Sequence, residues 1–245
     1  MERSSADKQE RDAFLPVFLE NYARIQEDMV NACAACGRSM EEITLLGVTK
    51  TVSPEHINVA LDNGIRQIGE NRVQEYLGKR EELHLQGVGV HLIGHLQTNK
   101  VDRIVGEVDM IQSVDSLKLA EAIDKASQKK QCVTDVLVEV NIGNEESKSG
   151  ISAEMCENLL YRVSALQNIH VRGLMTIPPI SDTEREKRAY FSHMQKLFID
   201  IKGKNIDNVT MDILSMGMSS DYVQAILEGS TMVRIGSALF GKRIY

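Results

Sequence analysis

Short aliphatic runs alternate along this chain with longer amphipathic stretches. The runs have the length and β-branched content of buried strands and lie at 43–49, 65–69, 90–94, 110–114, 135–141, 171–176, 211–215 and 232–235. Between them, apolar residues recur at helical spacing over 54–63, 72–83, 100–107, 116–128, 152–166, 182–201 and 220–228. Strands that alternate with helices predict parallel βαβ units.

A further helix is predicted ahead of the first strand. Its apolar positions are three or four residues apart, at Phe14, Phe18, Tyr22, Ile25, Met29 and Cys33. Gly37 is a plausible end for it. We expect residues 1–40 to hold this helix against the body of the protein, and residues 1–245 to form a single domain.

The fold class that fits this pattern is α/β, a single (β/α)8 TIM barrel with an extra N-terminal helix. An open doubly wound sheet usually carries a glycine-rich GxGxxG turn after its first strand, but residues 49–53 here read TKTVS. Aromatic residues make up only 4% of the chain and Trp is absent. The core is therefore mainly aliphatic, as the interior of a parallel barrel requires.

Composition narrows the classes of partner. The formal net charge of −7 argues against nucleic acid, because phosphate binding needs a basic face. No run approaches the roughly 20 apolar residues of a membrane span, and the charged segment 1–11 lacks the apolar core of a signal peptide. The Cys33–Cys36 pair has no second pair to complete a zinc site. We expect a cytoplasmic protein with reduced cysteines.

Lys50 is the most informative single residue. It ends the first predicted strand, and the Ser53-Pro54 that follows is typical of a helix start. Desolvation lowers the pKa of an ammonium group, and a neutral lysine amine attacks aldehydes, so Lys50 is a candidate Schiff-base lysine. The alternative is a lysine that reaches water past the end of a strand. Position alone favours that alternative, and the remaining strand ends reverse the balance.

The last two strands are followed by loops that suit a phosphate group. In a TIM barrel the active site lies at the carboxyl ends of the strands, and phosphate commonly binds the loops after strands seven and eight. Glycine and serine there bring backbone N–H and hydroxyl donors to an anion. The residues concerned are Ser215, Met216, Met218, Ser219, Gly236 and Ser237. Either loop alone is better explained as a turn or helix cap, but both together favour phosphate.

A phosphate cradle opposite a strand-end lysine predicts a phosphorylated carbonyl ligand. Pyridoxal 5′-phosphate (PLP) has both an aldehyde and a phosphate. Arg234 lies two residues before Gly236, so its side chain points to the same side of the strand and can lie against the pyridine nitrogen.

At this point the sequence resembles a known family. The segments are VTK at 48–50, GENRVQE at 69–75, HLIGHLQTNK at 91–100, SKSG at 147–150, LMT at 174–176, LSMGMS at 214–219 and VRIGSALFG at 233–241. They look like those of the YggS/PROSC family, the PLP homeostasis proteins, and the likeness extends from Leu45 to Gly241. The resemblance implies the alanine-racemase N-terminal barrel without the C-terminal β domain.

The resemblance also implies roles for individual residues. Lys50 would form the internal aldimine, Arg234 would contact the pyridine nitrogen, and the backbone at Gly236 and Ser237 would bind the phosphate. Ser219 would add its hydroxyl to the phosphate. The residues expected to line the rest of the pocket are Asn71, His95 and Met175.

We expect a protein that carries or buffers PLP and does not convert a substrate. It would bind and release PLP, and apo PLP-dependent enzymes would be its further partners. The alternative is a PLP-dependent amino-acid racemase. Racemisation by two bases needs a group on each face of the substrate, and beside Lys50 the chain offers no clear second base. A Schiff-base aldolase fits poorly because its lysine usually lies on a later strand.

Lys148 has two interpretations of equal weight: it assists PLP exchange, or it is a solvated loop lysine. Without a second domain, we expect a monomer.

Overall fold

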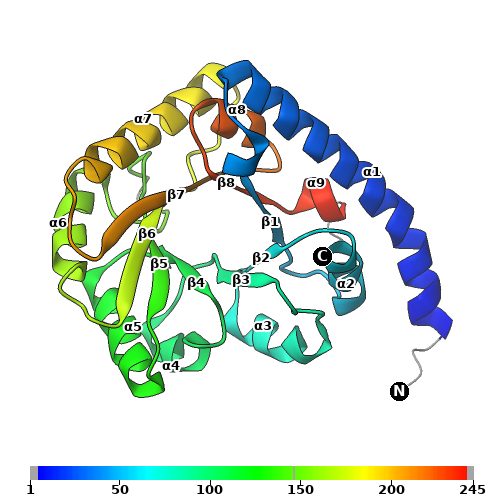
Figure 1. Cartoon of the computed structure of the whole chain (residues 1–245), viewed down its shortest axis with the longest axis horizontal. Helices are drawn as coiled ribbons and strands as arrows, with labels where there is room; N and C mark the ends of the chain where they lie inside the picture. The colour runs from blue at the N-terminus through cyan, green and yellow to red at the C-terminus, as the bar shows by residue number, and fades with distance from the viewer. Residues whose placement is uncertain (1–4, 146, 242–245) are drawn as a thin grey trace.

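The computed structural model describes residues 5–145 and 147–241, with side chains from residue 11 onward. Its eight strands are parallel and close into a barrel in chain order, β1 to β8, with helices outside (Figure 1). The predicted fold class is therefore confirmed. The strands are β1 (Thr44–Val48), β2 (Gln67–Glu70), β3 (Gly89–Leu92), β4 (Met110–Val114), β5 (Thr134–Glu139), β6 (Ile169–Met175), β7 (Val209–Met218) and β8 (Met232–Ile235).

The seventh strand is longer than the hydrophobic run that predicted it. It was expected to end at Ser215 but continues to Met218. The ladder with β8 shifts register between Ser215 and Met218, and Met218 then pairs with Arg234. A register shift of this kind re-aims a strand, and the run of hydrophobic residues does not encode it.

The helices are α1 (Ser5–Cys36), α2 (Pro54–Asp62), α3 (Val73–Lys79), α4 (Val101–Ile104), α5 (Leu117–Lys130), α6 (Ala153–Val163), α7 (Glu184–Lys202), α8 (Tyr222–Leu227) and α9 (Ser237–Phe240). Short 3-10 turns η1 (Met40–Glu42), η2 (Arg80–Glu82) and η3 (Thr98–Lys100) accompany them. The helix predicted over 100–107 is shorter than expected because Val105 already has extended backbone, with ψ 132°, and Gly106 has φ +73°.

The apolar core has two parts, as expected of a barrel whose strands alternate their side chains between inside and outside. The main core lies between the strands and the surrounding helices. Inside the barrel, Leu46, Val48, Ile93 and Met232 form one cluster, and a second contains Met110, Leu137 and Met175. Side chains from these two clusters therefore fill the barrel interior.

The predicted N-terminal helix is present as α1, which runs along the outside of the barrel against α2, α8 and α9 (Figure 1). Five of its six predicted core positions are buried, and the sixth, Tyr22, is partly buried against the same core. Gly37 follows the helix with φ +70°, the left-handed conformation that ends many helices. None of the helices in the described part of the chain is long and apolar enough to cross a membrane.

Candidate functional site

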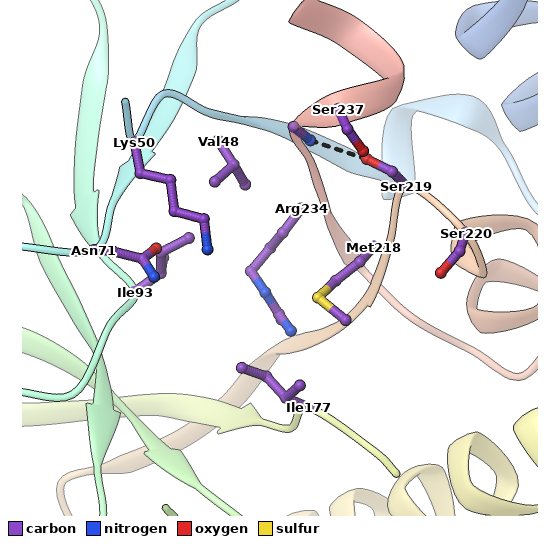
Figure 2. A pocket seen from close by; sticks show the side chains of 11 residues that line it. Val48, Lys50, Asn71, Ile93, Ile177, Met218, Ser219, Ser220, Arg234 and Ser237 are labelled. Carbon is purple, nitrogen blue, oxygen red and sulfur yellow. Dashed lines mark hydrogen bonds between the residues drawn. The ribbon is translucent and has the colours of Figure 1, made fainter. Parts of the chain in front are cut away.

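A cavity of about 270 Å³ opens at the carboxyl ends of the strands. Figure 2 shows its walls converging from the first strands on one side and the last strands on the other. It is lined by Val48, Lys50, Asn71, Ile93, Ile177, Met218, Ser219, Ser220, Arg234, Gly236 and Ser237. The volume is slightly below the roughly 300–1,000 Å³ common for small-molecule sites.

Seven residues singled out from the sequence meet in this cavity: Lys50, Asn71, Met218, Ser219, Arg234, Gly236 and Ser237. The other four lie elsewhere. Met175 packs inside the barrel with Met110 and Leu137, and Met216 is fully buried in the main core. His95 is more than half exposed, with Nδ1 3.5 Å from Asp115. Ser215 is buried behind Arg234.

Four lining residues were not anticipated: Val48, Ile93, Ile177 and Ser220. Val48 and Ile93 share an interior cluster with Leu46, so the alternation along each strand could have identified the last inward-facing residue as a candidate wall. Ile177 and Ser220 come from loops, where no periodicity indicates direction. Together with Met218, the aliphatic residues give the cavity an apolar side.

Lys50 lies in a tight turn between β1 and α2. The turn is closed by a hydrogen bond from the Val52 N–H to the Thr49 carbonyl, 3.1 Å long, and Ser53 caps α2 by accepting from the His56 N–H. Figure 2 shows the Lys50 side chain extended into the cavity, with its amine near Asn71 and on the side that faces Arg234. The amine is therefore presented to a ligand by a structured turn.

Arg234, on β8, is a buried cation whose donors are partly committed to the protein. Its Nη1 donates to Ser215 Oγ at 2.7 Å and its Nη2 to the Thr176 carbonyl at 2.8 Å. Burial lowers the pKa of Arg234 to about 10, against the opposing influence of Glu139 and Asp221. Since that value is still well above neutrality, the guanidinium is charged at physiological pH.

A chain of buried hydrogen bonds extends behind Arg234 across the barrel. Ser215 Oγ donates to Gln112 Oε1 at 2.8 Å, and Gln112 Nε2 lies 2.7 Å from His91 Nδ1. Burial lowers the pKa of His91 to about 4, so the ring is neutral and its Nδ1 accepts from the amide. The direction of every bond in the chain follows from Arg234, which can only donate.

Glu139, at the end of β5, is a second buried charged group near the mouth. Burial raises its pKa to about 7, with a further increase from Asp115 and a smaller decrease from Arg234. The carboxyl therefore titrates close to physiological pH, and the electrostatic environment of Arg234 changes when it does.

The side of the cavity opposite Lys50 carries hydrogen-bond donors that suit an anion (Figure 2). Ser219 Oγ accepts from the Gly236 N–H at 3.1 Å (Figure 2). It also accepts from the Ala238 N–H at 3.2 Å, at the start of α9. Gly217 has φ +92°, and a Cβ there would lie 2.5 Å from the Ala225 Cβ. Glycine is therefore required for the loop to pass this closely. The result is a group of backbone and hydroxyl donors of the kind that holds phosphate.

Lys148 lies in the loop after β5 and is not among the residues that line the cavity. Its Nζ donates to the Pro178 carbonyl at 3.0 Å and forms an ion pair with Glu145. The amine thus ties its own loop to the loop that carries Ile177. Among the residues that the structure describes, no three His, Cys, Asp or Glu side chains gather as a metal site requires.

Comparison with known proteins places this arrangement in a family. Residues 26–243 match the alanine racemase N-terminal domain family. A protein of Aquifex aeolicus named pyridoxal phosphate homeostasis protein is 43% identical over 226 residues, which cover 92% of this chain and 98% of that protein. The chain belongs to the pyridoxal phosphate homeostasis protein family. Its barrel is the N-terminal fold of alanine racemase.

Solved structures agree with this assignment. The structure of PipY from Synechococcus elongatus with PLP bound has a TM-score of 0.76 and 32% identity, covering 87% of this chain and all of PipY. Alanine racemase from Clostridium difficile has the same fold, with a TM-score of 0.74 at 17% identity, covering 95% of this chain but 60% of the racemase. The family resemblance seen in the sequence is confirmed.

Proposed function

We propose that this protein binds PLP in the cavity at the barrel mouth and takes part in PLP homeostasis by holding and releasing it. The observation that carries the proposal is the meeting of three groups in one cavity: the Lys50 amine, the charged Arg234 and the donors around Ser219. The names of the relatives and the PLP-bound PipY structure support the same reading.

The residues present fit the cofactor. When bound, PLP supplies an aldehyde carbon that a primary amine can attack and a phosphate that hydrogen-bond donors can hold. Lys50 is the amine directed into the cavity. The N–H groups of Gly236 and Ala238 converge on one oxygen, that of Ser219, and a phosphate oxygen would be held by donors of the same kind.

Arg234 sets the electronic character of the bound cofactor. Its guanidinium is charged and held by Ser215 and Thr176, so it offers a hydrogen bond to a ring nitrogen but does not transfer a proton to it. A pyridine ring that stays unprotonated is a weak electron sink. The arginine alone does not separate storage of PLP from racemisation.

We further propose that the protein does not turn over a substrate. Of the residues that line the cavity, only Lys50 and Arg234 are ionisable, and Arg234 is fixed as a cation. A racemase needs a second acid–base group opposite its lysine. Exchange of the α-hydrogen of alanine in deuterated water, catalysed by the PLP-loaded protein and lost in Lys50→Ala, would contradict this proposal.

The absorbance spectrum of the purified protein tests PLP binding directly. Wild type is expected to show a visible absorbance band that borohydride removes, leaving a covalent label on Lys50 that peptide mass spectrometry locates. Lys50→Ala should lack both band and label, whereas Lys118→Ala, which alters an exposed lysine on α5, should behave as wild type. Wild type with no band after addition of PLP would overturn the proposal.

Lys148 is proposed to assist PLP exchange at the rim. Its amine lies between two mouth loops, bonded to Pro178 and Glu145, from which it can be released to meet a departing aldehyde. Lys148→Ala should slow PLP transfer to an apo-enzyme, measured by the recovery of that enzyme's activity, without removing the absorbance band. A transfer rate equal to that of Lys118→Ala would contradict this role.

We propose that the protein acts as a cytoplasmic monomer with apo PLP-dependent enzymes as recipients. All four cysteines are free thiols in the structure, which suits a reducing compartment. Light scattering coupled to size exclusion tests the monomer: a mass near twice the 27.4 kDa of the chain would contradict it.

A further inference from the structure

A buried ion pair lies directly behind the turn that carries Lys50, and the chemistry described above does not use it. Glu70, at the end of β2, is completely buried, and Lys79, at the end of α3, is 8% exposed. Lys79 Nζ is 2.8 Å from the Glu70 carboxylate. Burying two charges costs free energy that their attraction does not always offset, so the pair calls for an explanation.

A gain in the stability of the folded protein is a poor explanation for the buried Glu70–Lys79 pair. Burial raises the pKa of Glu70, and the attraction of Lys79 reduces that rise without reversing it. One oxygen of the Glu70 carboxylate, Oε2, is buried with no hydrogen-bond partner. Burying the Glu70 carboxylate therefore costs more than its partners return, so a gain in stability does not account for the pair.

The pair is bonded to the backbone on both sides of Lys50. Lys79 Nζ donates to the Thr49 carbonyl at 2.9 Å and lies 3.5 Å from the Val52 carbonyl. The Thr49 hydroxyl donates to Glu70. The residue before Lys50 and the second residue after it are thus connected to the same ammonium group.

A second carboxylate holds the residue that immediately follows Lys50. Glu75, on α3, accepts from the Thr51 N–H at 2.5 Å and lies 3.2 Å from Lys79 Nζ. Thr51 has φ +61°, a left-handed conformation that is costly for a β-branched residue and persists only where the surroundings impose it. Glu75 is the group that bonds its N–H in this conformation.

We infer that Glu70, Glu75 and Lys79 form a clamp that positions Lys50 for reaction with the aldehyde of PLP. The clamp holds Thr49, Thr51 and Val52 in place, so the amine between them enters the cavity in one direction. This inference rests on the proposed PLP-binding function. The three residues do not line the cavity; they act through the backbone of the turn and are positioning residues.

Glu75→Ala is the test variant, because Glu75 is partly exposed and its loss leaves the buried ion pair of Glu70 and Lys79 intact. Two ligands separate positioning from general damage: PLP, and pyridoxine 5′-phosphate, which has an alcohol in place of the aldehyde. Capture of PLP by Lys50, trapped with borohydride, should slow about tenfold, since small misplacement of a reacting group has large effects on rate. Affinity for pyridoxine 5′-phosphate should stay within a factor of two of wild type.

Two further variants serve as controls. Glu81→Ala removes an exposed carboxylate from the neighbouring turn η2 and should capture PLP at the wild-type rate. Glu75→Gln keeps an oxygen that can accept from the Thr51 N–H and should recover much of the rate. Capture by Glu75→Ala at the wild-type rate, or an equal loss for both ligands, would overturn the clamp.

A second readout does not depend on PLP. Reductive methylation with ¹³C-formaldehyde gives each lysine an NMR signal, and Lys50→Arg identifies that of Lys50. In Glu75→Ala this signal should move toward those of exposed lysines. If wild type captures no PLP, the proposed function fails and this signal decides the clamp: a shift supports it and an unchanged signal overturns it.

Discussion

At the scale of single residues, the site depends on groups whose charge is set by burial. Arg234 stays a cation although burial lowers its pKa to about 10, and His91 stays neutral because burial lowers its pKa to about 4. Glu139 is the exception, with a pKa raised to about 7. Its charge state should therefore vary within the physiological range.

Glu139 should make the folded protein less stable as pH rises. A folded-state pKa above the ordinary 4.5 contributes stability that is complete below about pH 4.5 and is lost as pH rises through about 7. Glu139→Gln removes that loss, so the variant should be more stable than wild type by about 2–3 kcal/mol at pH 8 and nearly equal to it at pH 4. Urea unfolding at both pH values measures this, and the same difference at each would contradict it.

Ser219 should contribute to phosphate affinity and not to recognition of the ring. Its hydroxyl oxygen accepts from the N–H groups of Gly236 and Ala238 and fixes the start of α9. Loss of one such hydrogen-bonding group is worth about 1 kcal/mol, so Ser219→Ala should weaken PLP binding about fivefold. Affinity for pyridoxal, which lacks phosphate, should not change. An equal loss for both ligands would show that the hydroxyl supports the pocket as a whole.

At the scale of elements, the irregular pairing of β6 with β7 directs two hydrogen-bond acceptors toward Arg234. The ladder shifts register between Val171 and Gly173, and the strand ends then place Thr176 and Ser215 where both accept from the guanidinium. Gly173 has φ +151°, and a Cβ there would lie 1.9 Å from the Ile213 carbonyl oxygen. The close approach of these two backbones requires glycine.

Gly173→Ala should therefore destabilise the protein strongly, by about 3 kcal/mol or more, because the contact is with backbone that cannot move aside. The matched control is Gly78→Ala, at an exposed site in α3 with nothing within 4 Å of the added Cβ. There, alanine should raise stability by about 0.5–1 kcal/mol. Chemical denaturation of both variants gives the comparison. Similar effects from the two would contradict the structural reason.

At the scale of the whole molecule, closure of the barrel joins the two halves of the site. β1 pairs with β8, with Leu46 opposite Arg234, so residues from the two ends of the chain face one cavity. A ligand held across this seam binds the folded state alone, because the seam does not exist in the unfolded chain. Binding and folding are therefore coupled.

PLP should raise the melting temperature, by an amount that grows with the logarithm of its concentration above the dissociation constant. A ligand at 100 times its dissociation constant adds about 2.7 kcal/mol of stability, and about 1 kcal/mol shifts the melting temperature by roughly 2–4 °C for a chain of this size. Calorimetry should therefore show a rise of roughly 5–10 °C in wild type and a much smaller rise in Lys50→Ala. No rise in wild type at saturating PLP would contradict binding across the seam.

The sequence by itself determined the barrel and the chemistry at its mouth. Aliphatic runs and amphipathic stretches report burial, which depends on residue type and spacing, so the strands and the helix α1 could be read from them. Lys50 could be recognised because a lysine is unusual at the end of a buried strand. Ser219 was recognised from the glycine- and serine-containing loops after the last two strands, and Arg234 from its spacing to Gly236. Family membership followed from the motifs that contain them.

Only the tertiary structure decided which of these residues share the cavity. Met175 lies on β6, and Ser215 and Met216 lie on β7, but all three are buried away from the opening. The alternation of side chains along each strand and the register shift in β7 determine which way each one faces. The clamp behind Lys50 was also invisible in the sequence. Its contacts join β2 and α3 to the turn after β1, and contacts between separate elements leave no periodic pattern along the chain.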